Sequence, residues 1–175
     1  SAIINKLAFG TSFGAPHPLE IEIAQKIIEL VHSYGISVQV GIIFGFDHDT
    51  KDVFKNTIDF LEEIGVQNAT FNMLTPYPGT PLFKRLEQEG RILTRDWSRY
   101  NGRIDVVYQP KHMTCQELQD GFHYANRRFY SLKSIAKRLW KSPVGLWWTL
   151  PLNLAYWFSY KLYCYQKNRE SSSES

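Results

Sequence analysis

Two short segments of the sequence have the composition of ligand-binding turns. The first, GIIFGFDHD at residues 41–49, follows a run of apolar residues and contains two glycines. Glycines at positions 41 and 45 leave one strand face without side chains, so that a flat ligand could approach the backbone closely. Phe44 and Phe46 could flank an aromatic base, and Asp47 could accept a hydrogen bond. The predicted binding residues here are Gly41, Ile43, Phe44, Gly45, Phe46 and Asp47.

The second segment, LTPYPGTPL at residues 74–82, has three prolines and a glycine in its central part. They fix an extended and then sharply turned path. A helix that starts after the turn would offer backbone N–H groups to an anion. The predicted binding residues are Thr75, Pro76, Pro78, Gly79 and Thr80. Because both segments follow strands, we expect them to lie at the same end of the sheet and to face the same opening of the fold.

Both segments also have a purely structural interpretation. Glycine within a strand more often marks close packing than a ligand. Asp49 or Thr50 would then only cap the next helix, and the proline-rich segment would be a rigid elbow. The sequence leaves the structural and the ligand-binding interpretations open.

Metal chemistry within this chain is not expected. The two cysteines, Cys115 and Cys164, lie far apart, and the five histidines show no ligand spacing. Disulfide scaffolds and Cys-based zinc or iron–sulfur sites are thereby excluded. Such sparse cysteine usage is typical of reduced thiols in a cytoplasmic protein. The net charge of +3 in 175 residues is too weak a bias to indicate a nucleic-acid partner.

The hydrophobic pattern predicts helices alternating with strands over the first ninety residues. Apolar positions repeat at helical spacing before and after a β-branched run that reads as a strand buried on both faces. The alternation predicts an α/β fold with parallel strands. Two strands cannot bury both faces of a sheet, so we expect partners outside the chain. The expected elements are helices at 19–34, 51–64 and 81–89 and strands at 36–46 and 68–74.

The pattern changes after Gly90. Asn101 and Gly102 indicate a turn, and residues 104–108 form a short β-prone run. Thr114 and Glu117 form a capping-box pattern that should open a helix reaching Lys141. Residues 142–160 carry no charge and are rich in tryptophan and tyrosine, which favours peripheral membrane contact over spanning or simple packing. A serine-rich end at 169–175 predicts a disordered tail.

The order of three motifs resembles a known family. GISVQVGIIFGFDHDT, MLTPYPGTPLFKRLEQEGRI and DWSRYNG…VVYQPKHMTCQEL follow one another in the chain. They resemble radical S-adenosylmethionine proteins of the cobalamin-binding-domain type that carry a C-terminal DUF4070 region. The resemblance covers roughly residues 20–140. It implies that residues 1–90 are the last βα units of a partial (βα)6 barrel, that 91–141 form a mostly helical DUF4070-like extension, and that 142–168 form the aromatic segment.

The resemblance also implies cofactors. Residues 41–45 match a motif near the adenine of S-adenosylmethionine, and family chemistry uses a [4Fe–4S] cluster to make a 5′-deoxyadenosyl radical, with methyl transfer where cobalamin is present. The cluster motif C-x-x-x-C-x-x-C is absent, so we expect cluster and cobalamin parts upstream in the same polypeptide and no activity from this chain alone. Whether cobalamin is used stays open. His48 stands where the family often has an acidic residue, and residues 7–18 do not match the family's helix.

The leading prediction is therefore the C-terminal part of a radical enzyme that performs methyl transfer or C–H modification. The aromatic end hints at a lipid-like substrate and at the inner face of the membrane as a place of action. A small nucleotide- or anion-binding α/β module and a membrane-associated interaction protein are alternatives.

Overall fold

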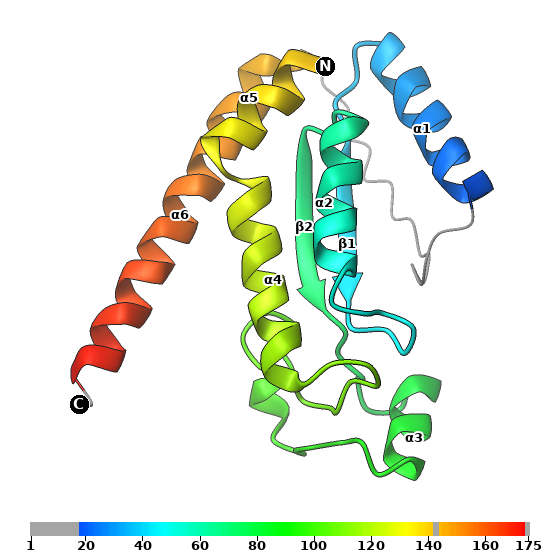
Figure 1. Ribbon diagram of the computed structural model, residues 1–175, viewed down its shortest axis with the longest axis vertical. Helices are drawn as coiled ribbons and strands as arrows, with labels where there is room; N and C mark the ends of the chain where they lie inside the picture. Colours follow the sequence, from blue (N-terminus) through cyan, green and yellow to red (C-terminus); the bar gives the residue numbers. More distant parts are fainter. Residues whose placement is uncertain (1–17, 142–143, 174–175) are drawn as a thin grey trace.

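A parallel pair of strands lies at the centre of the chain (Figure 1). The computed structural model describes residues 18–141 and 144–173. Strand β1 (Gln39–Phe44) pairs with β2 (Asn68–Met73), with Gln39 opposite Asn68 and Phe44 opposite Met73. Helix α1 (Pro18–Ser33) precedes β1, and α2 (Val53–Glu63) connects the two strands. The predicted parallel βαβ arrangement is confirmed.

The core fills one face of the strand pair. Phe44 lies 4.8 Å from Phe54 of α2 between ring centroids, and Phe71 lies 5.4 Å from Phe129 of helix α4 (Cys115–Phe129). A Cβ on Gly121 of α4 would lie 2.1 Å from the Phe54 ring. The absence of a side chain at Gly121 thus lets α2 and α4 cross closely over the strands.

The opposite face of the strand pair is covered by α6 (Leu146–Ser173) at Asn68, and the described residues leave its other part open. Gly41 and Ile43 of β1 share this face with Thr70 and Asn72 of β2, and the Ile43 side chain is 48% exposed. The described residues cover only one face of β1. The prediction that the strand is buried on both faces by partners outside the chain stays a prediction. The apolar run of β1 reflects one packed face and a second face that carries glycine and isoleucine without cover.

The extension after β2 begins with α3 (Pro81–Gln88) and a short 3₁₀ helix at Trp97–Arg99. The predicted β-prone run makes only an isolated antiparallel bridge, between Ile92 and Tyr108. Helices α4, α5 (Leu132–Lys141) and α6 (Leu146–Ser173) follow. The capping box of Thr114 and Glu117 is confirmed.

Three boundaries differ from the predictions. The helix expected to reach Lys141 breaks after Phe129, because the Ser131 hydroxyl accepts the Ser134 N–H and starts α5 anew. Helix α2 begins at Val53, and neither Asp49 nor Thr50 caps it with a side chain. Helix α6 continues to Ser173, into the predicted disordered tail, because extending a helix costs far less than nucleating one.

Candidate functional site

The open face of the strand pair offers the most accessible backbone. Gly41 lies opposite Thr70, and among the described residues a Cβ on Gly41 would meet only the Thr70 hydroxyl oxygen, at 3.7 Å. Ile43 lies opposite Asn72, whose Oδ1 accepts a hydrogen bond of 3.3 Å from Nε of Arg103. This face therefore combines bare backbone at one end with amide and guanidinium groups at the other.

Gly45 does not extend that open face. Its φ of +104° turns the chain, and a Cβ would lie 2.3 Å from the Tyr108 hydroxyl oxygen and 2.9 Å from Leu118. Its carbonyl oxygen accepts a hydrogen bond from the Tyr108 hydroxyl. Gly45 is thus needed because another part of the same chain approaches it closely. Tyr108 and Leu118 occupy the space in front of Gly45 where a ligand was predicted to lie.

Asp49 holds the turn that follows β1. Its Oδ2 accepts the N–H groups of Gly45 at 2.8 Å and Phe46 at 3.0 Å. The Asp49 side chain is buried, and among the described residues its Oδ1 has no hydrogen-bond partner. Burial raises the pKa of this carboxyl group, against the lowering effect of the two backbone donors.

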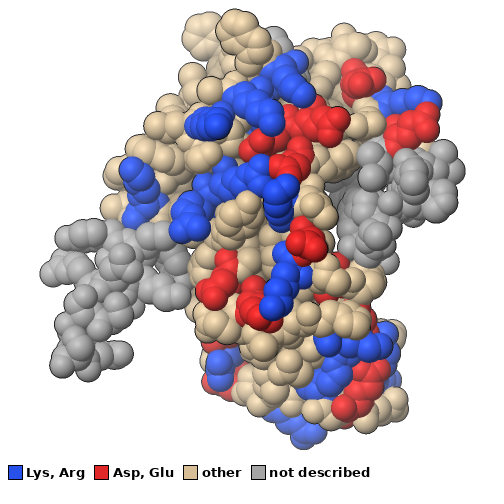
Figure 2. Space-filling model, viewed as in Figure 1, with Lys and Arg blue, Asp and Glu red and all other residues tan. Residues whose placement is uncertain are grey.

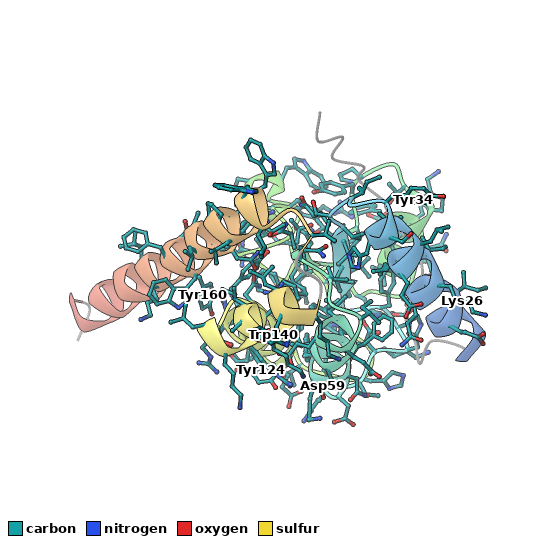
Figure 3. All side chains as sticks on the ribbon, turned by 90° about the horizontal axis from the view of Figure 1, so that it is seen from above. Lys26, Tyr34, Asp59, Tyr124, Trp140 and Tyr160 are labelled. Carbon is teal, nitrogen blue, oxygen red and sulfur yellow. The ribbon has the colours of Figure 1, made fainter. Side chains whose placement is uncertain are left out.

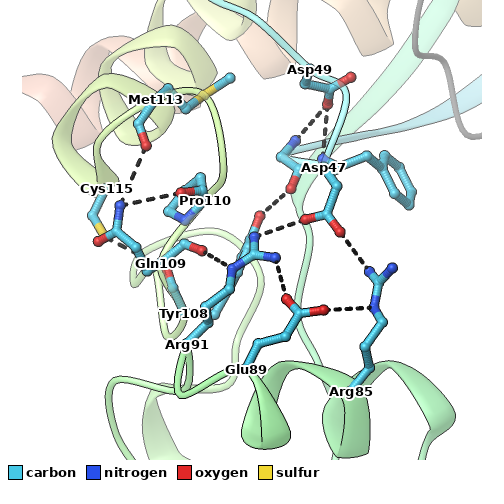
Figure 4. Close-up of polar contacts among 12 residues, drawn as sticks. Asp47, Asp49, Arg85, Glu89, Arg91, Tyr108, Gln109, Pro110, Met113 and Cys115 are labelled. Carbon is cyan, nitrogen blue, oxygen red and sulfur yellow. Dashed lines mark hydrogen bonds and ion pairs between the residues drawn. The ribbon is translucent and has the colours of Figure 1, made fainter.

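Asp47 is engaged by two arginines, as Figure 4 shows. Its Oδ2 lies 2.8 Å from Arg85 of α3, and its Oδ1 lies 2.8 Å from Arg91. Glu89 pairs in turn with Arg91, also at 2.8 Å. The hydrogen bond from Arg91 holds the pKa of Asp47 below its usual range. This carboxylate therefore ties the β1 turn to α3 and the extension.

The two phenylalanines of the first segment lie in different surroundings. Phe44 is buried in the core, on the face opposite Gly41, so its side chain cannot flank a base on the open face; that part of the prediction was wrong. Alternation along the strand gives the reason, since residues 41 and 44 point to opposite faces. Phe46 is partly exposed and stacks on His48, with ring centroids 5.8 Å apart.

The proline-rich segment forms the predicted elbow beside the β1 turn. The Leu74 N–H donates to the Phe44 carbonyl, so both segments lie at the same end of the strands. Thr80 caps α3, as predicted: its hydroxyl accepts the Phe83 N–H at 3.2 Å and donates to the Tyr77 carbonyl at 2.7 Å. Pro81, which has no N–H, follows the cap. The start of α3 therefore has few donors left for an anion.

The remaining predicted residues of the elbow are in part engaged and in part exposed. The Thr75 hydroxyl donates to the Met73 carbonyl at 3.1 Å, and Pro76 is buried. Pro78 and Gly79 are exposed, and the Gly79 φ of +83° makes the sharp turn. The structure thus brings the two predicted segments together but leaves Gly41, Ile43, Pro78 and Gly79 as the exposed members.

A cavity of about 410 Å³, which no sequence motif predicted, lies along the edge of β2 that faces away from β1. It is bounded by β2, by the turn at Arg103, and by helices α4 and α6. The aromatic residues of α4 and α6 were the available signal, but only the fold shows that they share one hollow. Its lining includes Thr70, Phe71, Ile104, Phe122, Tyr130 and Tyr156.

Among the residues that the structure describes, no group of three histidine, cysteine or acidic side chains could hold a metal ion. Cys115 is partly buried, and burial raises the pKa of its thiol, although it lies in the first turn of α4. The described part of the chain therefore offers no ligand set for an iron–sulfur cluster.

Comparison with known proteins identifies the family. The model of a domain of unknown function, DUF4070, matches residues 80–143. Bacteriochlorophyllide d C-12(1)-methyltransferase of Chlorobaculum tepidum is 31% identical over 124 residues, which cover 71% of this chain and 26% of that protein. Anaerobic magnesium-protoporphyrin IX monomethyl ester cyclase of Cereibacter sphaeroides is 31% identical over 117 residues, 67% of this chain and 19% of the cyclase. The chain belongs to the radical S-adenosylmethionine family.

Further similarity comes from a third member. Hopanoid C-2 methylase of Rhodopseudomonas palustris is 39% identical over 69 residues, 39% of this chain and 13% of the methylase. Radical S-adenosylmethionine enzymes use that cofactor with an iron–sulfur cluster. The chain spans about a quarter or less of the length of these relatives. Its DUF4070 region runs from the α3 cap through α5 and includes Arg85 and Arg91, which hold Asp47.

Proposed function

We propose that this chain forms the nucleoside-side wall of the active site in a radical S-adenosylmethionine enzyme. The observation that carries the proposal is Gly41, which presents bare backbone on the open face beside Thr70. A Cβ is absent where a flat adenine ring would need to approach, and among the described residues the Thr70 hydroxyl is the one group within 4 Å of that position. Ile43 and Asn72 continue the same face and would supply apolar and amide contacts to the nucleoside.

The described residues suit S-adenosylmethionine better than an iron–sulfur cluster. S-Adenosylmethionine supplies the radical chemistry of the family when it is bound beside a reduced cluster. The open face suits its nucleoside, whereas cluster ligands would have to come from other residues, because the described residues offer none. We accordingly propose that the isolated chain is inactive. The parallel register and the uncovered face support a place for β1 and β2 in a partial (βα)6 barrel.

The reaction we propose is methyl transfer to, or modification of, a carbon centre in an apolar, lipid-like substrate. Two of the three relatives reported above are named as methylating enzymes and one as a cyclase. The cavity beside β2 is lined by aromatic and aliphatic side chains and by five polar residues: Thr70, Arg103, His123, Asn126 and Ser159. Such a lining suits an apolar body that carries several polar groups.

The test uses the full-length protein with its cluster reconstituted under anaerobic conditions. Gly41→Ala and Gly41→Val put increasing bulk on the open face, and β-branched valine suits a strand, so the thermal midpoint should stay unchanged. S-Adenosylmethionine should bind about tenfold more weakly to Gly41→Val, equivalent to about 1.4 kcal/mol. Formation of 5′-deoxyadenosine should fall from the wild type to Gly41→Ala and fall further in Gly41→Val. Wild-type affinity in a folded Gly41→Val protein would refute the proposed wall.

A further inference from the structure

Helix α6 packs on the rest of the chain through its polar side chains. Asn153 is fully buried; its Nδ2 donates to the Gln67 carbonyl at 3.0 Å, and its Oδ1 accepts from Arg138 at 2.9 Å. Thr149 is also buried, one turn earlier. The Tyr160 hydroxyl donates to the His123 carbonyl at 3.1 Å, two turns after Asn153. The inward seam of α6 therefore carries hydroxyl and amide groups, together with the Tyr156 ring, which stacks on Tyr130.

The outward side of α6 is apolar. Trp147, Leu150, Leu154 and Phe158 recur at helical spacing on the side away from Thr149 and Asn153, and we call them the outward stripe. All four are exposed, Trp147 by 90% and Phe158 by 57%. A helix in contact with water normally turns its polar side outward. Helix α6 instead buries Thr149 and Asn153 and exposes the apolar side chains of the outward stripe.

Two more tryptophans are exposed on α5 and α6. Trp148 is 69% exposed beside the stripe, and Trp140 at the end of α5 is 90% exposed. Figure 3 shows α6 projecting from the body, with Trp140 labelled on α5 and Tyr34 on the side away from the projecting helix. Tryptophan is enriched where proteins meet the membrane–water interface, because the ring is apolar and the N–H is polar.

The charge around the stripe has one sign. From residue 121 to 169 the sequence contains lysines and arginines and no aspartate or glutamate. Lys137 and Arg128 are paired with Glu62 and Asp59 of α2. Figure 2 shows lysine and arginine side chains across the middle of this face, next to acidic ones. Lys133 and Lys161 make no ion pair with a described residue, and the Lys161 ammonium lies 4.4 Å from the centre of the Trp157 ring.

From these features we propose that the outward stripe, with Trp140 and Trp148, lies in the head-group region of a membrane that carries anionic lipids. Lys133 and Lys161 contact the head groups. The positive charge around the stripe favours anionic lipid as the partner. A second copy of this chain is disfavoured, because two copies would bring their lysines and arginines together. No helix in the described parts of the chain is long and apolar enough to cross a bilayer, so α6 lies along the surface. This proposal does not depend on the cofactor wall at Gly41.

The experiment measures co-sedimentation of the full-length protein with vesicles. Phosphatidylcholine vesicles with phosphatidylglycerol are compared with phosphatidylcholine alone. The wild type should bind the anionic vesicles more strongly. Trp147→Ser with Trp148→Ser should weaken partitioning about tenfold or more, because two interfacial aromatic anchors are lost. Tyr34→Ser removes an equally exposed aromatic ring from the opposite side and should leave binding unchanged.

A lysine pair separates charge from apolar contact. Lys133→Gln with Lys161→Gln should reduce binding to anionic vesicles by about tenfold and leave binding to neutral ones unchanged. Lys84→Gln with Lys111→Gln, also exposed, is the matched control. Thermal midpoints should agree among all variants, because the substituted side chains are exposed. Equal binding by the tryptophan variant, or no binding by the wild type, overturns the proposal. A shift from oligomer to monomer in that variant, without vesicle binding, would assign the stripe to self-association.

Discussion

The Tyr108 hydroxyl donates a hydrogen bond to the carbonyl oxygen of Gly45. Tyr108 belongs to the extension, and Gly45 to the turn after β1. Asp47, two residues further on, is held by Arg91 of the same extension. The DUF4070 region therefore fixes the shape of the loop that follows the first strand, and the candidate site depends on both parts of the chain.

Replacing Gly45 with alanine should destabilise the fold. The positive φ disfavours a side chain, and its Cβ would collide with the Tyr108 hydroxyl. We expect a loss of about 2–4 kcal/mol in the free energy of unfolding, from backbone strain and overpacking together. Urea denaturation measures it. Gly41→Ala is the control and should stay within about 0.5 kcal/mol of the wild type; equal losses in both variants would contradict the assigned roles.

Asp47→Asn should remove a stabilisation that depends on pH. The pKa of Asp47 is lowered by Arg91, so its contribution is complete above the unfolded pKa, near 3.8, and is lost as the pH falls through the lower folded pKa. The variant should be about 1–2 kcal/mol less stable at neutral pH and equal to the wild type in strong acid. Denaturation over a pH series checks this, and a constant difference down to the lowest pH would exclude the ion pairs as its source.

Asp49 contributes with the opposite sign. Burial raises its pKa, so its contribution is complete below the unfolded pKa and is lost as the pH rises through the folded pKa. The wild type and Asp47→Asn share this contribution. The difference between their pH profiles therefore isolates Asp47.

Arg138→Met should detach α6. The buried guanidinium donates to the carbonyls of Val66 and Gln67 and to Asn153, and it stacks 3.6 Å above the Phe129 ring centre. Burial lowers its pKa to about 10. The loss should be about 3–5 kcal/mol, because buried acceptors lose their donor. Hydrogen exchange should rise along α6. Lys133→Met on the exposed side of α5 serves as the control, and slow exchange in α6 of the arginine variant would argue against this anchor.

Cys115 should react slowly with alkylating agents. Burial raises the pKa of its thiol, and Sγ lies 3.6 Å from the Tyr108 carbonyl oxygen, so little thiolate forms near neutral pH. In a Cys164→Ser background, iodoacetamide should modify Cys115 about tenfold more slowly than a free cysteine. Denatured protein is the control for full reactivity. A rate above that of free cysteine would mean that the start of α4 activates the thiol after all.

The features that depend on neighbouring residues in the sequence, such as helix caps, could be predicted from short motifs. The caps at Thr80 and Thr114 were identified from short motifs, and both are present. The parallel pairing followed from the alternation of helix and strand. The break between α4 and α5 was missed, although Ser131 and Ser134 could have suggested a new cap.

The roles of the site residues depended on contacts between distant segments. Nothing near Gly45 in the sequence indicates that Tyr108 occupies the space in front of it, so a packing glycine and a binding glycine look alike. Asp47 likewise resembled a ligand acceptor until Arg85 and Arg91 were placed beside it. Gly41 keeps its predicted role as a proposal, because no other part of the described chain fills its face.

The contact between Tyr130 and Ala69 limits how the strands can be extended. The Tyr130 hydroxyl accepts the Ala69 N–H at 3.4 Å and donates to the Ala69 carbonyl at 2.5 Å, and further along β2 the Met73 N–H donates to the Gly102 carbonyl at 2.7 Å. Both positions belong to the edge of β2 that faces away from β1. An incoming strand would find this edge blocked at both ends, so the sheet can grow only beside β1, and β2 is protected against edge-to-edge aggregation.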